Sequence, residues 1–334
     1  RSSAFAIGIE QDWLEELNQN SDKSWQVKLS LPFAGVGEIT EIEKFVADKL
    51  SVPVSISAKV KLPSTYSFKQ IKHIVLVASG KGGVGKSTTA VNLASALEQE
   101  GAKVGILDAD IYGPSIPLLL GLQGAEPKTA DNKNLLPFEA HNLKAQSIGF
   151  LVPSDDATVW RGAMASGALN QLMNETAWGE LDYLIVDMPP GTGDIQLTMS
   201  QKVPASGAVI ITTPQDLALA DAQKGIAMFN KVNVPVLGLI ENMSYFLCGH
   251  CGKPNHVFGK DGAVKLAHRH GVPVLANIPL AIEIRESSEQ GDLIAKDNEA
   301  QISETYKTAA RVLASSLYYQ QAHTSAVEIV ITED

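Results

Sequence analysis

Residues 80–88 have the spacing of a phosphate-binding loop, Gly-x4-Gly-Lys-Ser. Glycines at these positions let backbone N–H groups turn inward around phosphate oxygens, and the start of the following helix adds its positive dipole end. Lys86 is expected to reach the β- and γ-phosphates of a nucleotide, and the Ser87 hydroxyl is expected to bind Mg²⁺. The residues predicted to contact the nucleotide here are Gly80, Lys81, Gly82, Gly83, Val84, Gly85, Lys86, Ser87 and Thr88.

Aspartates follow two of the apolar runs that read as buried strands. Asp108 and Asp110 follow the run 104–107, and Asp187 follows the run 183–186. An aspartate directly after such a strand commonly holds Mg²⁺ beside a phosphate loop, so we assign Asp187 to this role. We assign Asp110 to orienting the attacking water, with Asp108 facing the phosphates beside it. Each of the three is also a residue type that caps a following helix.

Two further positions complete the predicted nucleotide site. Gly191 lies in the run Asp-Met-Pro-Pro-Gly-Thr-Gly-Asp and is placed to offer its backbone N–H to the γ-phosphate. Asn242 follows the apolar run 236–240. Its amide group both donates and accepts hydrogen bonds, as pairing with adenine requires. We therefore predict ATP as the nucleotide.

The apolar runs predict which elements position these residues. From residue 71 onward strands alternate with helices, as in an α/β fold with a mostly parallel, doubly wound sheet of the P-loop NTPase type. Ligands of such sheets bind at the carboxyl ends of the strands, where the aspartate motifs fall. The predicted strands cover 74–78, 104–107, 183–186, 208–212 and 236–240, and the helix after the phosphate loop covers 88–100.

A small α+β domain is predicted ahead of the nucleotide-binding part. It covers residues 1–60, a polar linker covers 61–70, and the ATPase domain with a Cys-x-x-Cys motif covers 71–334. Inside the small domain, the pattern predicts a helix at 11–18, a strand at 25–31, a helix at 38–49 and a strand at 54–60.

The composition of the chain restricts which binding partners and which cellular compartment we expect. The net charge is −10, which argues against nucleic acid as a partner because phosphate contacts require a basic face. No apolar run approaches the roughly 20 residues of a membrane span, and no segment has a signal-peptide layout. Cys248 and Cys251 are the only cysteines, which does not suit a secreted disulfide framework. We expect a cytoplasmic protein that binds neither nucleic acid nor membrane.

The phosphate loop has lysines at both ends, Lys81 and Lys86, and resembles the deviant Walker A loop of the MinD/ParA/nitrogenase-iron-protein ATPases. The resemblance implies that Lys81 reaches across a homodimer to the partner's phosphates. It therefore implies a catalytic role for Lys81 beside Lys86 and Asp110, and weak ATP hydrolysis that depends on dimerisation.

Further motifs resemble those of one group within these ATPases, the Mrp/ApbC iron–sulfur carriers. This resemblance covers about residues 71–317. The motifs are Asp-Ala-Asp-Ile-Tyr-Gly-Pro-Ser (108–115), Trp-Arg-Gly (160–162), the run 187–194, Glu-Asn-Met-Ser-Tyr (241–245) and Cys-x-x-Cys (248–251). The chain departs from the family in having Gly249-His250 between the cysteines, and Ala163 after Trp-Arg-Gly, where the family commonly has proline. Neither departure removes a thiol. The first 60 residues resemble the small domain often found ahead of bacterial Mrp ATPases.

Two cysteines per chain supply half of the ligands of a [4Fe–4S] cluster, which needs four thiolates. Cys248 and Cys251 of two copies, facing each other across a two-fold axis, supply all four. Zinc bound by the two thiolates with His250 or His256 is an alternative, in a closed structural site. A redox pair is another alternative, but the glycine and proline that follow the motif argue against the helix start that it needs.

These observations predict an ATP-binding and ATP-hydrolysing carrier that holds a [4Fe–4S] cluster between two subunits. Its expected partners are a second copy of itself, recipient iron–sulfur apoproteins and cluster assembly proteins. The alternative is a positioning ATPase of the MinD/ParA type in which the Cys-x-x-Cys motif is a structural zinc site.

Overall fold

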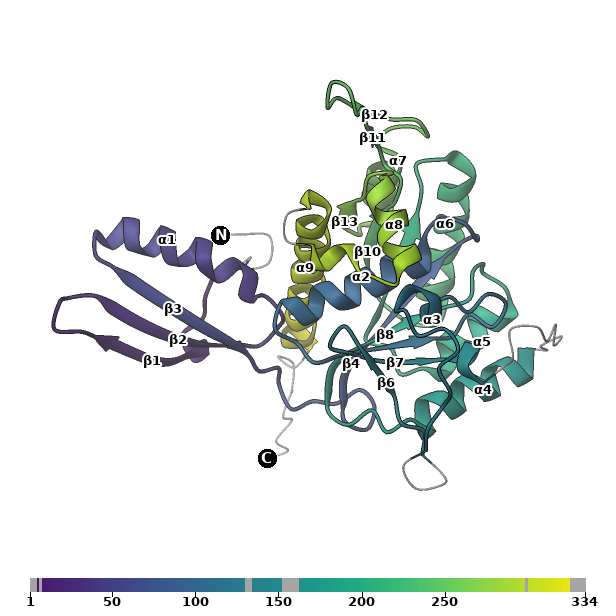
Figure 1. The fold of residues 1–334 in the computed structure, drawn as a ribbon, viewed down its shortest axis with the longest axis horizontal. Helices are drawn as coiled ribbons and strands as arrows, with labels where there is room; N and C mark the ends of the chain where they lie inside the picture. The colour runs from purple at the N-terminus through teal and green to yellow at the C-terminus, as the bar shows by residue number, and fades with distance from the viewer. Residues whose placement is uncertain (1–4, 6–7, 130–133, 152–161, 298–299, 325–334) are drawn as a thin grey trace, which may run out of the picture.

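An eight-stranded sheet lies at the centre of the computed structural model, which describes residues 5, 8–129, 134–151, 162–297 and 300–324 (Figure 1). The strand order is β13-β10-β9-β4-β8-β5-β7-β6, and every neighbouring pair is parallel except β6 with β7. The predicted α/β fold with a mostly parallel sheet is confirmed. The strands are β4 (Ile71–Ser79), β5 (Val104–Asp108), β6 (Phe138–Ala140), β7 (Leu143–Ser147), β8 (Leu181–Asp187), β9 (Gly207–Thr212), β10 (Val236–Glu241) and β13 (Val274–Asn277).

Helices cover both faces of this sheet, and strand β4 shows why. Its residues Val75 and Val77 belong to one buried core, whereas Ile74 and Leu76 belong to the other. Successive side chains of a strand point to opposite faces, so a strand that is apolar throughout must be covered twice. The first core includes α2 (Lys86–Gln99), α3 (Ile116–Leu119) and α9 (Gln301–Thr324), with α8 (Ile282–Gln290) at its margin; the second includes α4 (Gly162–Glu175), α5 (Asp194–Lys202), α6 (Asp216–Lys231) and α7 (Gly262–His270). None of the described helices combines the length and hydrophobicity needed to cross a bilayer.

A three-stranded sheet with one helix forms the N-terminal module, which extends to the left in Figure 1. Its elements are β1 (Leu14–Gln19), β2 (Trp25–Leu31), α1 (Ile39–Leu50) and β3 (Val54–Val60). The helix predicted at 11–18 is wrong. A short 3₁₀ turn, Gln11–Trp13, leads into β1 instead, because antiparallel pairing with β2 outweighs the helix propensity of the Leu-Glu-Glu-Leu run. The domain boundaries given above stay predictions.

The N-terminal module docks on the far end of α2, the helix that begins at the phosphate loop. The Glu100 carbonyl, just after α2, accepts hydrogen bonds from the backbone N–H groups of Gly35 and Val36. Its carboxylate accepts one from Gly37 at 2.7 Å. Since Glu100 is only 1% exposed, its charge needs a buried partner.

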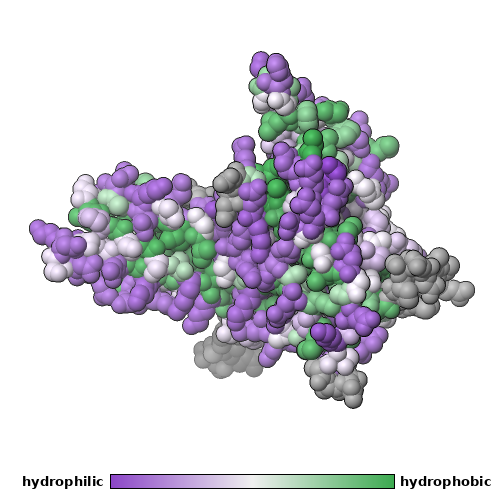
Figure 2. All heavy atoms as spheres, viewed as in Figure 1, coloured by the Kyte–Doolittle hydropathy of each residue, from purple (hydrophilic) through white to green (hydrophobic). Residues whose placement is uncertain are grey.

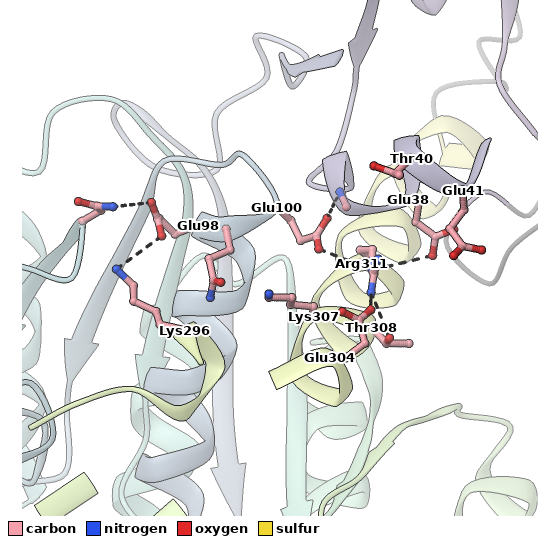
Figure 3. A pocket seen from close by; sticks show the side chains of 13 residues that line it. Glu38, Thr40, Glu41, Glu98, Glu100, Lys296, Glu304, Lys307, Thr308 and Arg311 are labelled. Atoms are coloured by element: carbon pink, nitrogen blue, oxygen red, sulfur yellow. Dashed lines mark hydrogen bonds and ion pairs between the residues drawn. The ribbon is translucent and has the colours of Figure 1, made fainter. Parts of the chain in front are cut away.

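Arg311 of α9 supplies that partner charge. Figure 3 shows its guanidinium between Glu38 of the N-terminal module, Glu100 and Glu304. The guanidinium lies 3.7 Å from Glu100 and 3.9 Å from Glu38. These residues line the 860 Å³ cleft between the module and the central sheet domain. Burial raises the pKa of Glu100, and the charge of Arg311 opposes that rise. The docking therefore depends on a buried ion pair, which becomes costly if only one partner is removed.

We expect Arg311→Met to lower the free energy of unfolding by about 3 kcal/mol, because Glu100 is left as a buried, unpaired carboxylate. Pairing it with Glu100→Gln should recover a large part of the loss. Chemical denaturation of the parent, Arg311→Met and the double variant measures both effects.

Arg285→Met is the matched control, because it removes an arginine whose ion pairs with Glu286 and Glu289 are exposed. Its stability should stay close to that of the parent. Equal losses in the Arg311 and Arg285 variants would contradict a special role for the buried pair.

Candidate functional site

The phosphate-loop residues lie between the end of β4 and the start of α2. Gly83 and Gly85 have φ angles of +79° and +82°, a conformation that side chains rarely adopt. A Cβ atom on Gly85 would lie 2.2 Å from the amide nitrogen of Asn242, so a side chain is excluded there on two grounds. Thr89 donates its backbone N–H to the Gly85 carbonyl and so begins the helix directly after the loop. The glycines therefore bring the loop backbone to the N-terminus of α2, which suits phosphate binding.

The neighbouring strands β5 and β8 bring the aspartates to this loop. Asp108 and Asp187 are direct partners in the parallel register. Lys86 Nζ lies 2.5 Å from Asp187 Oδ1 and 3.5 Å from Asp110 Oδ2. Lys86 is 6% exposed and Asp187 is fully buried. The structure thus gathers a cation and three carboxylates at the carboxyl edge of the sheet.

Burial controls the electrostatics of the three carboxylates. It raises the pKa of Asp187, and the charge of Lys86 opposes this rise. Burial also raises the pKa of Asp110, again opposed by Lys86. The pKa of Asp108 is raised to about 7, first by burial and then by the negative charge of Asp187. Without the lysine the cluster would hold mutually repelling, desolvated charges.

Asp108 is occupied in shaping its own loop, which differs from the expectation that it faces the phosphates beside Asp110. Its carboxylate accepts hydrogen bonds from the backbone of Asp110 at 3.1 Å and of Ile116 at 3.0 Å, and from the Ser147 hydroxyl at 3.0 Å. The two carboxylates would point to the same side only if the strand continued through Asp110, but β5 ends at Asp108. Sequence reasoning missed Ser147, which ends β7 and has no motif around it.

The donor set beside Lys86 fits a magnesium ion. Asp187 Oδ2 is buried and accepts no hydrogen bond within the described part of the chain. The Ser87 hydroxyl lies 3.2 Å from Lys86 Nζ, next to the same carboxylate. A carboxylate and a hydroxyl beside a phosphate loop are ligands that Mg²⁺ takes together with phosphate oxygens and water.

Lys81 and Gly191 lie at the same edge but have other partners. Lys81 Nζ is 3.4 Å from the side-chain oxygen of Gln215, at the start of α6, and Lys81 has no ion pair among the residues that the structure describes. The Gly191 N–H is donated to the Ser79 carbonyl at 2.9 Å. Contact of this N–H with a γ-phosphate therefore requires that bond to break.

A cavity of 280 Å³ adjoins the phosphate loop and has the setting of a nucleotide base site. Gly85 and Thr88 form its wall on the phosphate side, and Asn242 and Met243 follow β10 into it. The Asn242 amide nitrogen is bonded to the Val84 carbonyl at 2.8 Å. Asn242 thus holds the phosphate loop, a role that the sequence did not suggest, and its amide oxygen is the group left for a base.

The two cysteines lie on a short hairpin that projects from the molecule at the top of Figure 1. Its strands, β11 (Phe246–Leu247) and β12 (Pro254–Asn255), are paired antiparallel. Cys248 is half-buried, Cys251 is exposed, and both are free thiols. Backbone N–H groups of His250 and Cys251 lower the pKa of the Cys248 thiol and so favour the thiolate that metals bind. Figure 2 shows hydrophobic residues at the base of this projection, where Phe246, Leu247 and Val257 are exposed.

The hairpin geometry bears on both alternatives for the Cys-x-x-Cys motif. Across the described ranges, no group of three or more His, Cys, Asp and Glu side chains is arranged to hold a metal ion. His256 is instead bonded through Nδ1 to the Ser244 carbonyl at 3.2 Å. The cysteines also lie in a turn and not at the start of a helix, where redox pairs gain their reactivity. Trp160 and Arg161 of the Trp-Arg-Gly motif lie outside the described residues.

Comparisons with known proteins agree with this combination of sites. The family model described as the ParA-type NUBPL iron-transfer P-loop NTPase matches residues 70–314. The iron–sulfur cluster carrier protein of Haemophilus influenzae is 48% identical over 319 residues, covering 92% of this chain and 86% of the relative. The iron–sulfur cluster transfer protein NUBPL of Mus musculus is 52% identical over 232 residues, covering 69% of this chain and 72% of the relative.

Solved structures show the same central domain. A nucleotide-binding protein from Archaeoglobus fulgidus, solved in complex with ADP, matches with a TM-score of 0.62 and 38% identity, over 71% of this chain and 93% of that chain. The cell division ATPase MinD of Pyrococcus furiosus matches with a TM-score of 0.54 and 22% identity, over 72% of this chain and 98% of that chain. The second match shows the fold alone.

We expect Gly85→Ala to destabilise the nucleotide-free protein by about 2 kcal/mol, because a Cβ meets both a left-handed backbone and the Asn242 amide. Gly82→Ala is the matched control, since a Cβ there meets nothing within 4 Å and its φ is not positive. Chemical denaturation of both variants without nucleotide checks this. Equal stabilities would show that Gly85 and Asn242 are not locked together.

Proposed function

The chain belongs to the NUBPL iron-transfer P-loop NTPase family, and we propose that it is a homodimeric, ATP-hydrolysing carrier that holds a [4Fe–4S] cluster between its two copies. Its function as an iron–sulfur cluster carrier agrees with the names of relatives that cover most of the chain. Its ATPase site is the phosphate loop with the aspartates around Lys86. Nucleotide type, metal, cluster type and assembly are the parts that we propose.

The observation that carries the proposal is the position of the two cysteines. They project from the molecule on a hairpin, at least partly exposed, with no third metal-binding side chain grouped with them in the described residues. Two thiolates leave a [4Fe–4S] cluster half-ligated, and two copies related by a two-fold axis complete it. A cluster held between copies at an exposed turn is accessible to a recipient protein, as a carrier requires.

The nucleotide site suits phosphoryl transfer from ATP to water. The phosphates would lie against the N-terminus of α2, held by the loop residues Gly80, Gly82, Gly83, Val84, Gly85 and Thr88. When ATP binds, Lys86 would exchange its carboxylate partners for the β- and γ-phosphates. Asp110 would then lie beside these phosphates and orient the attacking water. Asp187 and Ser87 would hold Mg²⁺, which neutralises phosphate charge when bound. Asp108 positions the loop that carries Asp110.

Lys81 is assigned to the partner's site. Its ammonium group contacts Gln215 and none of the site's own carboxylates, so it is available to a second copy. A cation supplied in trans stabilises transition-state charge only after dimerisation, as an arginine finger does. Hydrolysis would then be weak in the monomer and would increase when two copies form a dimer.

The proposed partners are a second copy, recipient iron–sulfur apoproteins and cluster assembly proteins, in the cytoplasm. The net charge of −10 makes nucleic acid an unsuitable partner. The exposed hairpin is the surface that would present the cluster to these proteins.

Anaerobic reconstitution with iron and sulfide tests the carrier function. We expect a visible cluster absorption and about four irons per dimer, because four thiolates hold one [4Fe–4S] cluster. The double variant Cys248→Ala/Cys251→Ala should lose both signals while retaining ADP binding. If the protein retained zinc and took up no iron, the Cys-x-x-Cys motif would instead be a structural zinc site.

Mixing two inactive variants tests the trans role of Lys81. Lys81→Ala and Asp110→Ala should each hydrolyse ATP poorly alone. A mixed dimer has one site with an intact Asp110 and the partner's Lys81, so an equimolar mixture should regain about a quarter of the parental activity if copies exchange at random. Steady-state phosphate release measures it. No recovery in a mixture shown to exchange subunits would place Lys81 in its own site.

A further inference from the structure

The base cavity and the cysteine hairpin share a wall. Residues 279–281 line the 280 Å³ cavity beside the phosphate loop, and they also line a 520 Å³ groove beneath the hairpin. Asn242 and Met243 face the first cavity, and Tyr245, Phe246 and Leu247 line the second. One continuous segment therefore runs from the base cavity to Cys248 within six residues.

Backbone hydrogen bonds fasten this segment to the shared wall. Ile278 donates to the Glu241 carbonyl at 2.9 Å, Ser244 donates to the Ile278 carbonyl at 2.9 Å, and Leu280 donates to the Tyr245 carbonyl at 2.7 Å. Because the two segments are bonded on both sides of Met243, a displacement of the wall is passed to the strand that enters the hairpin.

The hairpin has little stability of its own. Each of its strands contributes only two residues, and an isolated two-stranded hairpin is marginal in water. Its returning strand is tied to the segment by His256 Nδ1, 3.2 Å from the Ser244 carbonyl. The position of the cysteine turn is therefore set at its base, by Ser244, Tyr245 and Leu280.

Met243 is the strained point in this segment. Its φ angle is +54°, in the left-handed region that a residue with a Cβ rarely adopts. Its neighbours hold it there, since Asn242 donates to the Thr212 carbonyl at 2.8 Å and Ser244 is bonded to Ile278. Strained residues of this kind persist where the surroundings fix them, and they cluster at binding and switch sites.

We propose that Met243 is a positioning residue that couples the nucleotide base to the cysteine turn. A base that fills the cavity contacts Met243 and Leu280, fixes the strained turn against the shared wall, and so restrains the hairpin that carries Cys248 and Cys251. The inference rests on the proposed function, because it takes the base of ATP or ADP to occupy this cavity. It adds the residues through which nucleotide binding acts on cluster binding.

The thiols themselves report this coupling, because Cys248 and Cys251 are the only cysteines of the chain. We would measure the rate of iodoacetamide alkylation of the metal-free protein without ligand, with saturating ADP, and with tripolyphosphate, which fills the phosphate loop but not the base cavity. We expect ADP to slow alkylation about fivefold, within the usual range of coupling between sites, and tripolyphosphate to leave the rate unchanged.

Met243→Gly is the decisive variant, because glycine accepts the left-handed backbone but brings no side chain to the base. It should lose the effect of ADP on alkylation while it still binds ADP in a calorimeter. Leu280→Ala should weaken the effect in the same way. Asn233→Gly is the matched control: it replaces another left-handed residue, with φ +57°, that lines neither cavity, and it should respond to ADP as the parent does.

Three outcomes would overturn the coupling. If ADP binds but does not slow alkylation, there is no coupling. If tripolyphosphate slows alkylation as much as ADP does, the effect comes from the phosphate loop and not from the base cavity. A Met243→Gly protein that still responds to ADP removes Met243 from the path. Failure of the parent to bind ADP at all would instead overturn the proposed nucleotide site, and the coupling with it.

Discussion

The contact between Lys86 and Asp187 is the interaction on which the rest of the site depends. Both groups are buried, and two more carboxylates, Asp108 and Asp110, lie within the same cluster. A fold that collects three desolvated acids at one sheet edge is stable only with a cation among them. The nucleotide-free protein therefore uses the phosphate-loop lysine as a structural counterion. In the proposed function, a bound nucleotide and Mg²⁺ take over the two charges of this ion pair.

The need to balance buried charges applies at both ends of helix α2. Its first residue is Lys86, and the residue after its last is Glu100, which receives the N-terminal module and the ion pair with Arg311. Each end of the helix thus has a buried charge that a partner from another element must balance. The stretch between them is largely buried, and its apolar residues pack into the core with β4 and α9. The helix joins the nucleotide site and the N-terminal module as one rigid element.

The sequence predicted the regular parts of the fold well, because alternating or continuous apolar runs determine strands such as Trp25–Leu31 and Val54–Val60. It failed at 11–18, where pairing with a neighbouring strand, invisible to local propensity, decided the structure. In the site, the phosphate-loop spacing located the residues. The bond from Ser147 to Asp108 and the partners of Gly191 and Asn242 could not be predicted, because they join segments far apart in the sequence.

The two functional regions are built on opposite principles, and a carrier needs both. The nucleotide site consists of buried charges whose positions are over-determined, which suits catalysis by preorganised electrostatics. The cysteine turn is exposed, and its short hairpin takes its position from the segment that enters it. A site that must release its cargo cannot be closed and rigid in every state. In the coupling that we propose, the rigid part therefore controls the cargo through the few backbone hydrogen bonds at the base of the hairpin.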